Sequence, residues 1–181
     1  MRSAYGLKIP EPDPLLTRVG PGTPCGELMR RYWQPVCLSV DLKDLPKPVR
    51  ILGEDLVAFR DGEGKVGLLF FRCSHRGTSL EYGRVEKRGL RCCYHGWLYD
   101  VEGNVLEMPL EPAANPFLKQ IQHPCYPVRE FGGLVFAWST SLSSSSYSEK
   151  DQCSTRLTAV PPIFTVPVSP RMVIEPSRLR G

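Results

Sequence analysis

Histidine and long apolar runs are both scarce in this 181-residue sequence. The only histidines are His75, His95 and His123. No stretch approaches the roughly 18 apolar residues of a membrane-spanning helix. The first residues, MRSAYGLKIPEPDP, lack the apolar segment of a secretory signal. These absences predict a cytoplasmic protein with no membrane partner, and they leave few positions for a histidine-ligated metal.

The sequence also lacks a concentration of positive or negative charge. The formal net charge is +4, from 23 Lys and Arg against 19 Asp and Glu, and no segment gathers the cations into a stripe. A nucleic-acid partner is therefore not expected. The seven cysteines are an odd number, and without an export signal a disulfide framework is not expected. Clustered Cys and His in such a chain more often bind metal.

Short apolar segments separated by Gly and Pro turns predict an all-β, antiparallel domain over residues 35–138. Hardly any helix is expected within it, and Gly-containing turns predict hairpins. The candidate strands are residues 36–40, 49–53, 54–60, 65–71, 97–100, 104–108, 125–130 and 134–138.

The two flanks of this domain have a different character. Residues 1–34 form an extension rich in Pro and Gly, in which Thr23 and Pro24 predict the start of a short helix. The apolar face of that helix would contain Leu28, Met29, Tyr32 and Trp33. Residues 139–181 are rich in Ser, Thr and then Pro, with no apolar period, and predict an irregular or disordered tail.

Residues 72–100 contain two short pairs of potential metal ligands. Cys73-Ser74-His75 forms the first pair and Cys92-Cys93-Tyr94-His95 the second, with sixteen residues between His75 and Cys92. Thiolate and imidazole are both good ligands for iron and zinc. A glycine follows each pair, and glycine permits the positive φ of a tight turn. Two such pairs, each on a turn between strands, can converge on one metal site.

This segment resembles the Rieske iron–sulfur motif, Cys-x-His followed by Cys-x-x-His. The flanking Arg76-Gly77 and Gly96-Trp97 also look like the cluster-binding loops of aromatic ring-hydroxylating oxygenases, specifically their phthalate-dioxygenase-like α subunits. The similarity runs from about Gly20 through Trp138, and it includes the stretches GELMRRYWQPV and EFGGLVFAW. The resemblance implies a Rieske-type domain.

The resemblance further implies a [2Fe-2S] cluster with divided ligands. Cys73 and Cys92 would hold one iron as thiolates, and His75 and His95 would hold the other as neutral imidazoles. Exchanging two thiolates for imidazoles raises the reduction potential above that of an all-Cys cluster. The edges of the imidazole rings are expected at the surface, where electrons can leave.

Neighbouring side chains receive supporting roles from the same resemblance. Tyr94 would hydrogen-bond toward a cluster or cysteine sulfur, Trp97 would pack under the second loop, and Arg76 would pair with an acidic partner surface. Taken singly, Trp97 is more often plain core and Arg76 a solvated charge. Cys93 is interpreted as a small buried hydrophobe, and His123 as a surface residue rather than a ligand.

The implied partners are a ferredoxin or flavin reductase as electron donor and the catalytic iron domain of an oxygenase as acceptor, in a homo-oligomer for the full-length form. That domain holds a mononuclear Fe(II) through two His and one carboxylate. With His75 and His95 assigned to the cluster, only His123 remains, so this chain is expected to lack the second iron site. Together with the change of composition after Trp138, this predicts a truncated gene product, such as one from a frameshift.

Three functions therefore stay open. The chain can be the electron-transfer part of an oxygenase α subunit, not catalytic alone. It can be a free-standing Rieske ferredoxin, which its short length favours and the GELMRRYWQPV segment disfavours. It can also be a structural zinc domain with a tetrahedral Cys₂His₂ site, although zinc sites rarely carry both the Arg-Gly and the Gly-Trp flanks.

Overall fold

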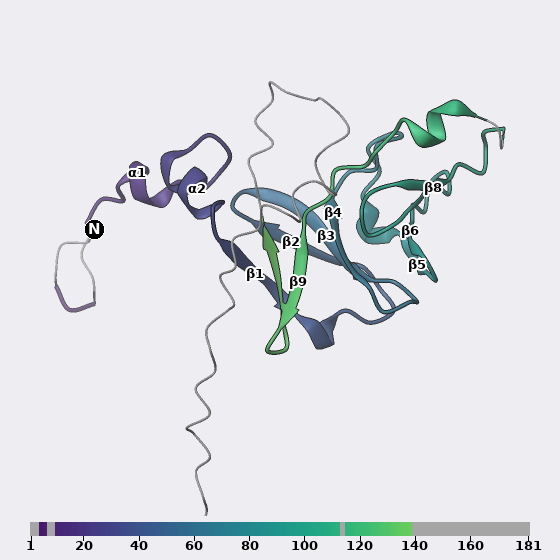
Figure 1. The fold of residues 1–181 in the computed structure, drawn as a ribbon. Coiled ribbons are helices and arrows are strands. Elements are labelled where there is room, and N and C mark those ends of the chain that lie inside the picture. The colour runs from purple at the N-terminus through teal and green to yellow at the C-terminus, as the bar shows by residue number, and fades with distance from the viewer. Residues whose placement is uncertain (1–3, 7–9, 113–114, 139–181) are drawn as a thin grey trace, which may run out of the picture.

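The computed structural model describes residues 4–6, 10–112 and 115–138. Within them the chain forms three small antiparallel sheets preceded by two short α-helices (Figure 1). The predicted all-β, antiparallel fold with a short N-terminal helix is thereby confirmed. The predicted irregular tail, residues 139–181, lies outside the described residues. No helix in the described part of the chain is long and apolar enough to cross a membrane.

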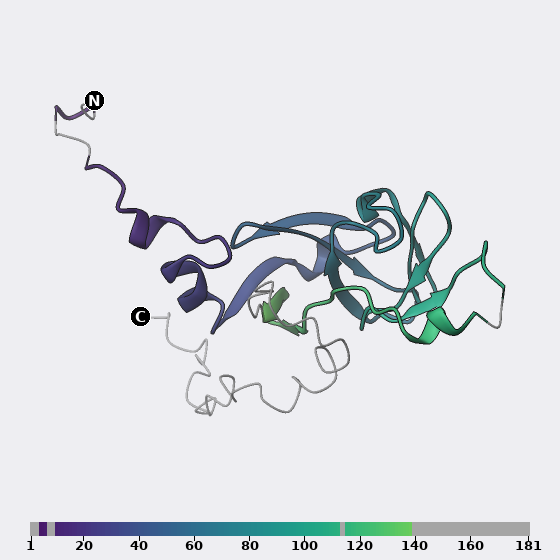
Figure 2. The ribbon, with the colours of Figure 1, turned by 90° about the horizontal axis from the view of Figure 1, so that it is seen from above.

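The predicted short helix is present as α2 (Pro24–Met29), with Thr23 as its cap. The Thr23 hydroxyl oxygen accepts from the Gly26 N–H at 3.3 Å. A further one-turn helix, α1 (Pro14–Thr17), was not predicted. Figures 1 and 2 show both helices at the end of the molecule remote from β5–β8.

The predicted apolar face of α2 is wrong. Gly26 is the buried residue of this helix, and a Cβ there would meet the Gly20 carbonyl oxygen at 2.4 Å. The helix therefore packs through its glycine side, which needs a bare backbone. The side chains predicted to be buried go elsewhere: Leu28, Met29 and Tyr32 are exposed, whereas Trp33 is buried at the start of the first strand.

Two three-stranded sheets form the centre of the molecule. The first has the order β1-β10-β9 and the second β2-β3-β4, all antiparallel. Their strands are β1 (Trp33–Leu38), β9 (Val128–Phe131), β10 (Leu134–Trp138), β2 (Lys47–Ile51), β3 (Glu54–Arg60) and β4 (Val66–Phe70). The predicted hairpins over 49–71 and 125–138 are confirmed. The predicted strand at 36–40 ends early, because Ser39–Asp41 turns into the 3₁₀ helix η1.

β3 joins two separate cores. Strand alternation sends Leu56 and Ala58 into a cluster with Tyr126 and Val135, whereas Val57 and Phe59 face the other way. The second cluster contains Cys73, Leu80, Leu90, Cys92, Trp97, Tyr99, Val105 and Met108. Two predicted ligands thus belong to the hydrophobic core itself.

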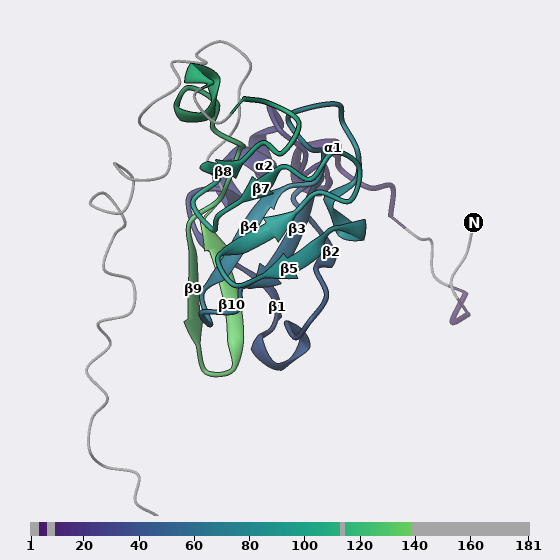
Figure 3. The same ribbon diagram turned by 90° about the vertical axis from the view of Figure 1, so that its right-hand side faces the viewer.

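The third sheet carries the site. It has the order β5-β6-β7-β8, with β5 (Arg84–Glu86), β6 (Gly89–Arg91), β7 (Leu98–Tyr99) and β8 (Val105–Glu107) (Figure 3). The β7–β8 hairpin was predicted, but β5 and β6 were not, because each is only three residues long and the segment is highly charged. The remaining 3₁₀ helices are η2 (Leu80–Tyr82) and η3 (Pro116–Lys119).

Candidate metal centre

The first ligand pair lies on a loop, residues 73–78, that follows β4 (the first loop). Its backbone closes on itself: the Cys73 N–H donates to the Thr78 carbonyl oxygen at 2.9 Å, and the Gly77 N–H donates to the Cys73 carbonyl oxygen at 2.8 Å. Gly77 has a φ of 70°, a conformation that side chains disfavour. The glycine after the pair is therefore needed for the turn, as the sequence predicted.

The second pair lies on residues 92–97 between β6 and β7 (the second loop), and the same pattern recurs. The Cys92 N–H donates to the Trp97 carbonyl oxygen at 2.8 Å, and the Gly96 N–H donates to the Cys92 carbonyl oxygen at 3.2 Å. Gly96 has a φ of 73°. Counted from its cysteine, each loop has its glycine at the same position and its two closing hydrogen bonds at the same positions.

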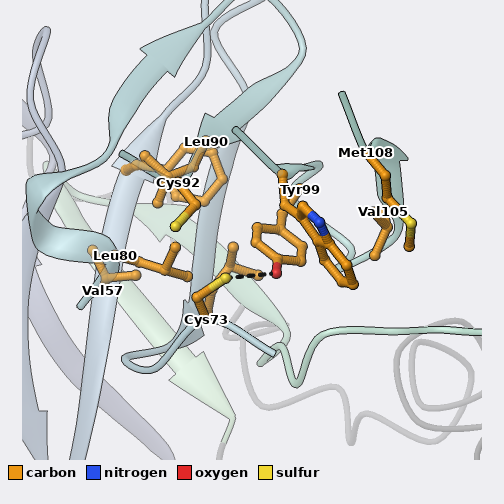
Figure 4. Packing of buried hydrophobic residues seen from close by; sticks show 11 residues of the cluster. Val57, Cys73, Leu80, Leu90, Cys92, Tyr99, Val105 and Met108 are labelled. Carbon is orange, nitrogen blue, oxygen red and sulfur yellow. Dashed lines mark hydrogen bonds between the residues drawn. The ribbon is translucent and has the colours of Figure 1, made fainter. Parts of the chain in front are cut away.

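The two cysteines present their thiols to one another inside the core. Cys73 and Cys92 are 4% and 3% exposed, and Figure 4 shows their sulfur atoms pointing toward one another. Burial raises the pKa of the Cys73 thiol, while the Tyr99 hydroxyl and the His75 backbone N–H lower it. A thiol in the core becomes a strong ligand when a metal displaces its proton.

The two histidines lie together at the rim of this core. The centroids of the His75 and His95 rings are 4.5 Å apart, and both rings are half-buried. His75 also stacks on Trp97, with centroids 4.8 Å apart and planes inclined by 2°. Burial, and then the neighbouring His95, lower the pKa of His75, which favours the neutral imidazole that binds metals.

The His75 Nδ1 atom is buried and has no hydrogen-bond partner in the structure. Such an orphaned nitrogen is uncommon and calls for an explanation. Among the described residues, no three His, Cys, Asp or Glu side chains are placed to hold a single metal ion. Two thiols and two imidazoles in separate pairs suit a [2Fe-2S] cluster, in which each iron takes two protein ligands. The residues present fit that group.

The phenol that reaches a cysteine sulfur is that of Tyr99, not the predicted Tyr94. Tyr99 is fully buried, and its hydroxyl lies 3.0 Å from the Cys73 Sγ atom (Figure 4). Burial, and then contact with Cys73, raise the pKa of Tyr99, so the phenol keeps its proton and donates. Tyr94 is 63% exposed, and its ring lies 3.7 Å from that of His95.

A sequence signal for Tyr99 existed in the predicted strand 97–100. Residues two apart on a strand share a face, so Tyr99 lies on the same side as Trp97. The prediction that Trp97 packs beneath the second loop agrees with its burial, and its ring also reaches the first loop through His75. Arg76 is exposed, and its pairing with a partner stays a prediction.

Two further expectations are corrected. Cys93 is exposed rather than buried, because the second loop turns Cys92 inward and its neighbour outward. His123 is fully buried rather than on the surface. Isolated β-bridges fix the chain just before and just after His123: Gln122 pairs with Asn104, and Cys125 pairs with Leu69. These bridges bring the histidine behind the first loop.

The arrangement agrees with the similarity of the chain to known proteins. Residues 32–127 match the family model described as "Rieske [2Fe-2S] domain". The chain is 57% identical over 136 residues to the phenoxybenzoate dioxygenase subunit alpha of Ectopseudomonas oleovorans, covering 75% of this chain and 33% of that protein. It is 49% identical over 135 residues to the phthalate 4,5-dioxygenase oxygenase subunit of Pseudomonas putida, covering 73% and 31%.

A solved structure shares the fold. It is the reduced complex between oxygenase and ferredoxin in carbazole 1,9a-dioxygenase, with a TM-score of 0.53 and 33% identity over 60% of this chain and 28% of that one. The chain spans about a third of the length of the curated relatives it matches. The resemblance to oxygenase α subunits is confirmed for this part. With more than half of its residues matching the family model, the chain belongs to the Rieske [2Fe-2S] domain family.

Proposed function

We propose that this chain holds its [2Fe-2S] cluster through Cys73, His75, Cys92 and His95 and transfers single electrons as part of a ring-hydroxylating oxygenase. The observation that carries the proposal is the pair of equivalent loops, each closed by the same two backbone hydrogen bonds. These loops bring two buried thiols and two half-buried imidazoles together. The orphaned Nδ1 atom of His75 is the nitrogen available for iron.

The core and the rim of the site have different roles: the core surrounds the two thiols, and the rim carries the two imidazoles. When bound, the cluster supplies a one-electron carrier. The core around Cys73 and Cys92 excludes water from the sulfur side. There the Tyr99 phenol and the His75 backbone N–H direct positive partial charge at the Cys73 sulfur, which favours its ionised form. On the other side the imidazole rings are half-buried, with Trp97 fixing the plane of His75.

The proposed partners follow from the relatives. The carbazole oxygenase whose structure resembles this chain is in complex with a ferredoxin, so we propose that a ferredoxin or a flavin reductase reduces this chain. The exposed Arg76 would meet an acidic surface of that donor. The acceptor would be the mononuclear Fe(II) of an oxygenase catalytic domain in a homo-oligomer. His123 cannot serve that iron, because both of its ring nitrogens are hydrogen-bonded inside the core.

The direct test is spectroscopy of the full chain purified without oxygen. We expect a coloured protein with iron and acid-labile sulfide in equal amounts and a rhombic EPR signal after dithionite reduction. A colourless protein containing one zinc ion per chain would sink the proposal. Adding the chain to a reductase and a separate oxygenase then tests its place: turnover in trans would identify a free-standing ferredoxin instead of an oxygenase part.

A further inference from the structure

His123 lies in the core without any role in the proposed ligand set. Its residue exposure is 0%, and a buried imidazole needs partners for both nitrogens. Nε2 lies 2.9 Å from the Phe70 carbonyl oxygen, and Nδ1 lies 2.7 Å from the Ser74 hydroxyl oxygen. Phe70 ends β4, and Ser74 lies between two proposed ligands. The ring thus connects the rigid sheet to the first loop.

The hydrogen-bond directions follow from the chemistry. A carbonyl oxygen only accepts, so the proton of the neutral ring must be on Nε2 and Nδ1 must accept. The Ser74 hydroxyl therefore donates to His123 and has no proton left for another acceptor. Burial lowers the pKa of His123 to about 4, so the ring is neutral and keeps this tautomer at neutral pH.

The contacts continue to a cluster ligand. The His123 ring lies against that of Tyr99, with centroids 4.6 Å apart. The Ser74 backbone N–H also points at the Tyr99 oxygen, and this oxygen lies 3.0 Å from the Cys73 Sγ atom. His123 therefore contacts both groups, Ser74 and Tyr99, whose positions decide how well the phenol can donate to the sulfur.

We infer that His123 is a positioning residue that acts through Ser74 to hold the Tyr99–Cys73 hydrogen bond and thereby keeps the cluster's reduction potential high. The inference rests on the proposed function. A hydrogen bond to a cluster sulfur stabilises the more negative, reduced state. Loosening the loop that aligns this bond lowers the potential without removing any ligand.

The test is redox titration, followed by EPR, of variants of the full chain. Ser74→Ala removes the hydroxyl, and His123→Gln replaces the rigid ring, which holds both contacts at once, by a flexible amide. Both should keep the cluster and lower its potential, by less than Tyr99→Phe does. Ser74→Thr keeps a hydroxyl and should stay near the wild-type potential.

A double-mutant cycle makes the assignment specific. In the Tyr99→Phe background, Ser74→Ala should cause a much smaller further shift, because the bond it aligns is already gone. The matched control is Tyr126→Phe, which removes a partly buried hydrogen bond from a tyrosine of the other core cluster to Glu54 and should leave the potential unchanged.

The outcomes separate the two claims. If the wild-type chain shows no Rieske spectrum, the proposed function fails. If wild type and variants all hold the cluster and Ser74→Ala leaves the potential and g-values unmoved, the positioning role of His123 is overturned while the function stands. Equal shifts from Ser74→Ala with and without the Tyr99 hydroxyl would also overturn it. Should His123→Gln fail to fold, Ser74→Ala, at a loop position, still decides.

Discussion

The two cluster loops have the same backbone but are supported in different ways. The first loop is supported from the core by uncharged groups, since Tyr99 contacts Cys73 and His123 contacts Ser74. An arginine precedes the cysteine of each loop, and each arginine points at the loop's glycine carbonyl. Arg72 reaches that of Gly77 only at 3.5 Å and is exposed.

The second loop relies on its arginine instead. Arg91 donates to the Gly96 carbonyl oxygen at 2.6 Å. Glu86 accepts two hydrogen bonds from the same guanidinium, at 2.7 and 2.8 Å, and Glu107 accepts one at 2.6 Å. The side chain of Arg91 is 19% exposed. The two loops therefore reach the same backbone geometry by different means: neutral core contacts support the first loop, and a charged network supports the second.

The largest expected effect is loss of the whole cluster when a proposed ligand on either loop is substituted. Cys92→Ala removes a buried thiol that we assign to iron, so the purified chain should lack the absorption and EPR signals of the cluster. Cys93→Ala, at the exposed neighbouring thiol, should retain both signals. A retained cluster in Cys92→Ala would contradict the assignment of this ligand.

The two arginines offer a matched pair for the stability of the loops. Arg91→Gln breaks a network of partly buried charges and should lower the free energy of unfolding by about 2 kcal/mol. Arg72→Gln removes a long contact at an exposed position and should change it by less than about 0.5 kcal/mol. Chemical denaturation of both variants measures the difference. Equal losses would show that the two arginines support their loops alike.

A smaller effect concerns the tuning of the first loop. Tyr99→Phe keeps the ring in the core but removes the donor to Cys73 Sγ. The reduction potential should fall by on the order of 100 mV, since a hydrogen bond to a charged group contributes about 1.5–3 kcal/mol and 59 mV corresponds to a tenfold change for one electron. Tyr94→Phe is the control, and redox titration should find it unchanged. A similar fall in both variants would return the tuning role to Tyr94.

The smallest effect is the response of the second loop to acid. The hydrogen bonds from Arg91 lower the pKa of Glu86 to about 2 in the folded protein, from 4.5. A depressed pKa stabilises the fold above pH 4.5, and this stabilisation is lost as the pH falls from about 4.5 to about 2. Wild type should therefore lose more stability over this range than Arg91→Gln, as measured by denaturation at each pH. Equal losses of stability in wild type and Arg91→Gln over this pH range would show that the Arg91–Glu86 pair does not contribute to the acid response.

The sequence predicted the parts of the site that are local and missed those that depend on packing. Ligand spacing and the glycine of each loop are short-range features, so the motif in residues 72–100 sufficed. The side chains that contact the first loop are distant in sequence. Tyr99 is 26 positions from Cys73, and His123 is 49 positions from Ser74. Only the closure of the sheets brings them together.

The fold shows the same division. Alternation and glycine turns predicted the longer hairpins, whereas β5 and β6 were not predicted because each has only three residues and charged residues make up most of the segment 84–91. The structure explains those charges: Glu86 on β5 and Arg91 on β6 belong to the network of the second loop. The charged residues of this segment therefore support the second loop.

The central claim is that two thiolates hold one iron and two imidazoles hold the other. Mössbauer spectroscopy of the full chain enriched in ⁵⁷Fe tests this most directly, because it resolves each iron by its ligands. We predict two unlike iron sites in equal amounts, with the added electron located on one of them after reduction. A spectrum with a single iron environment, as two equivalent sites would give, would contradict the division of the ligands between the two irons.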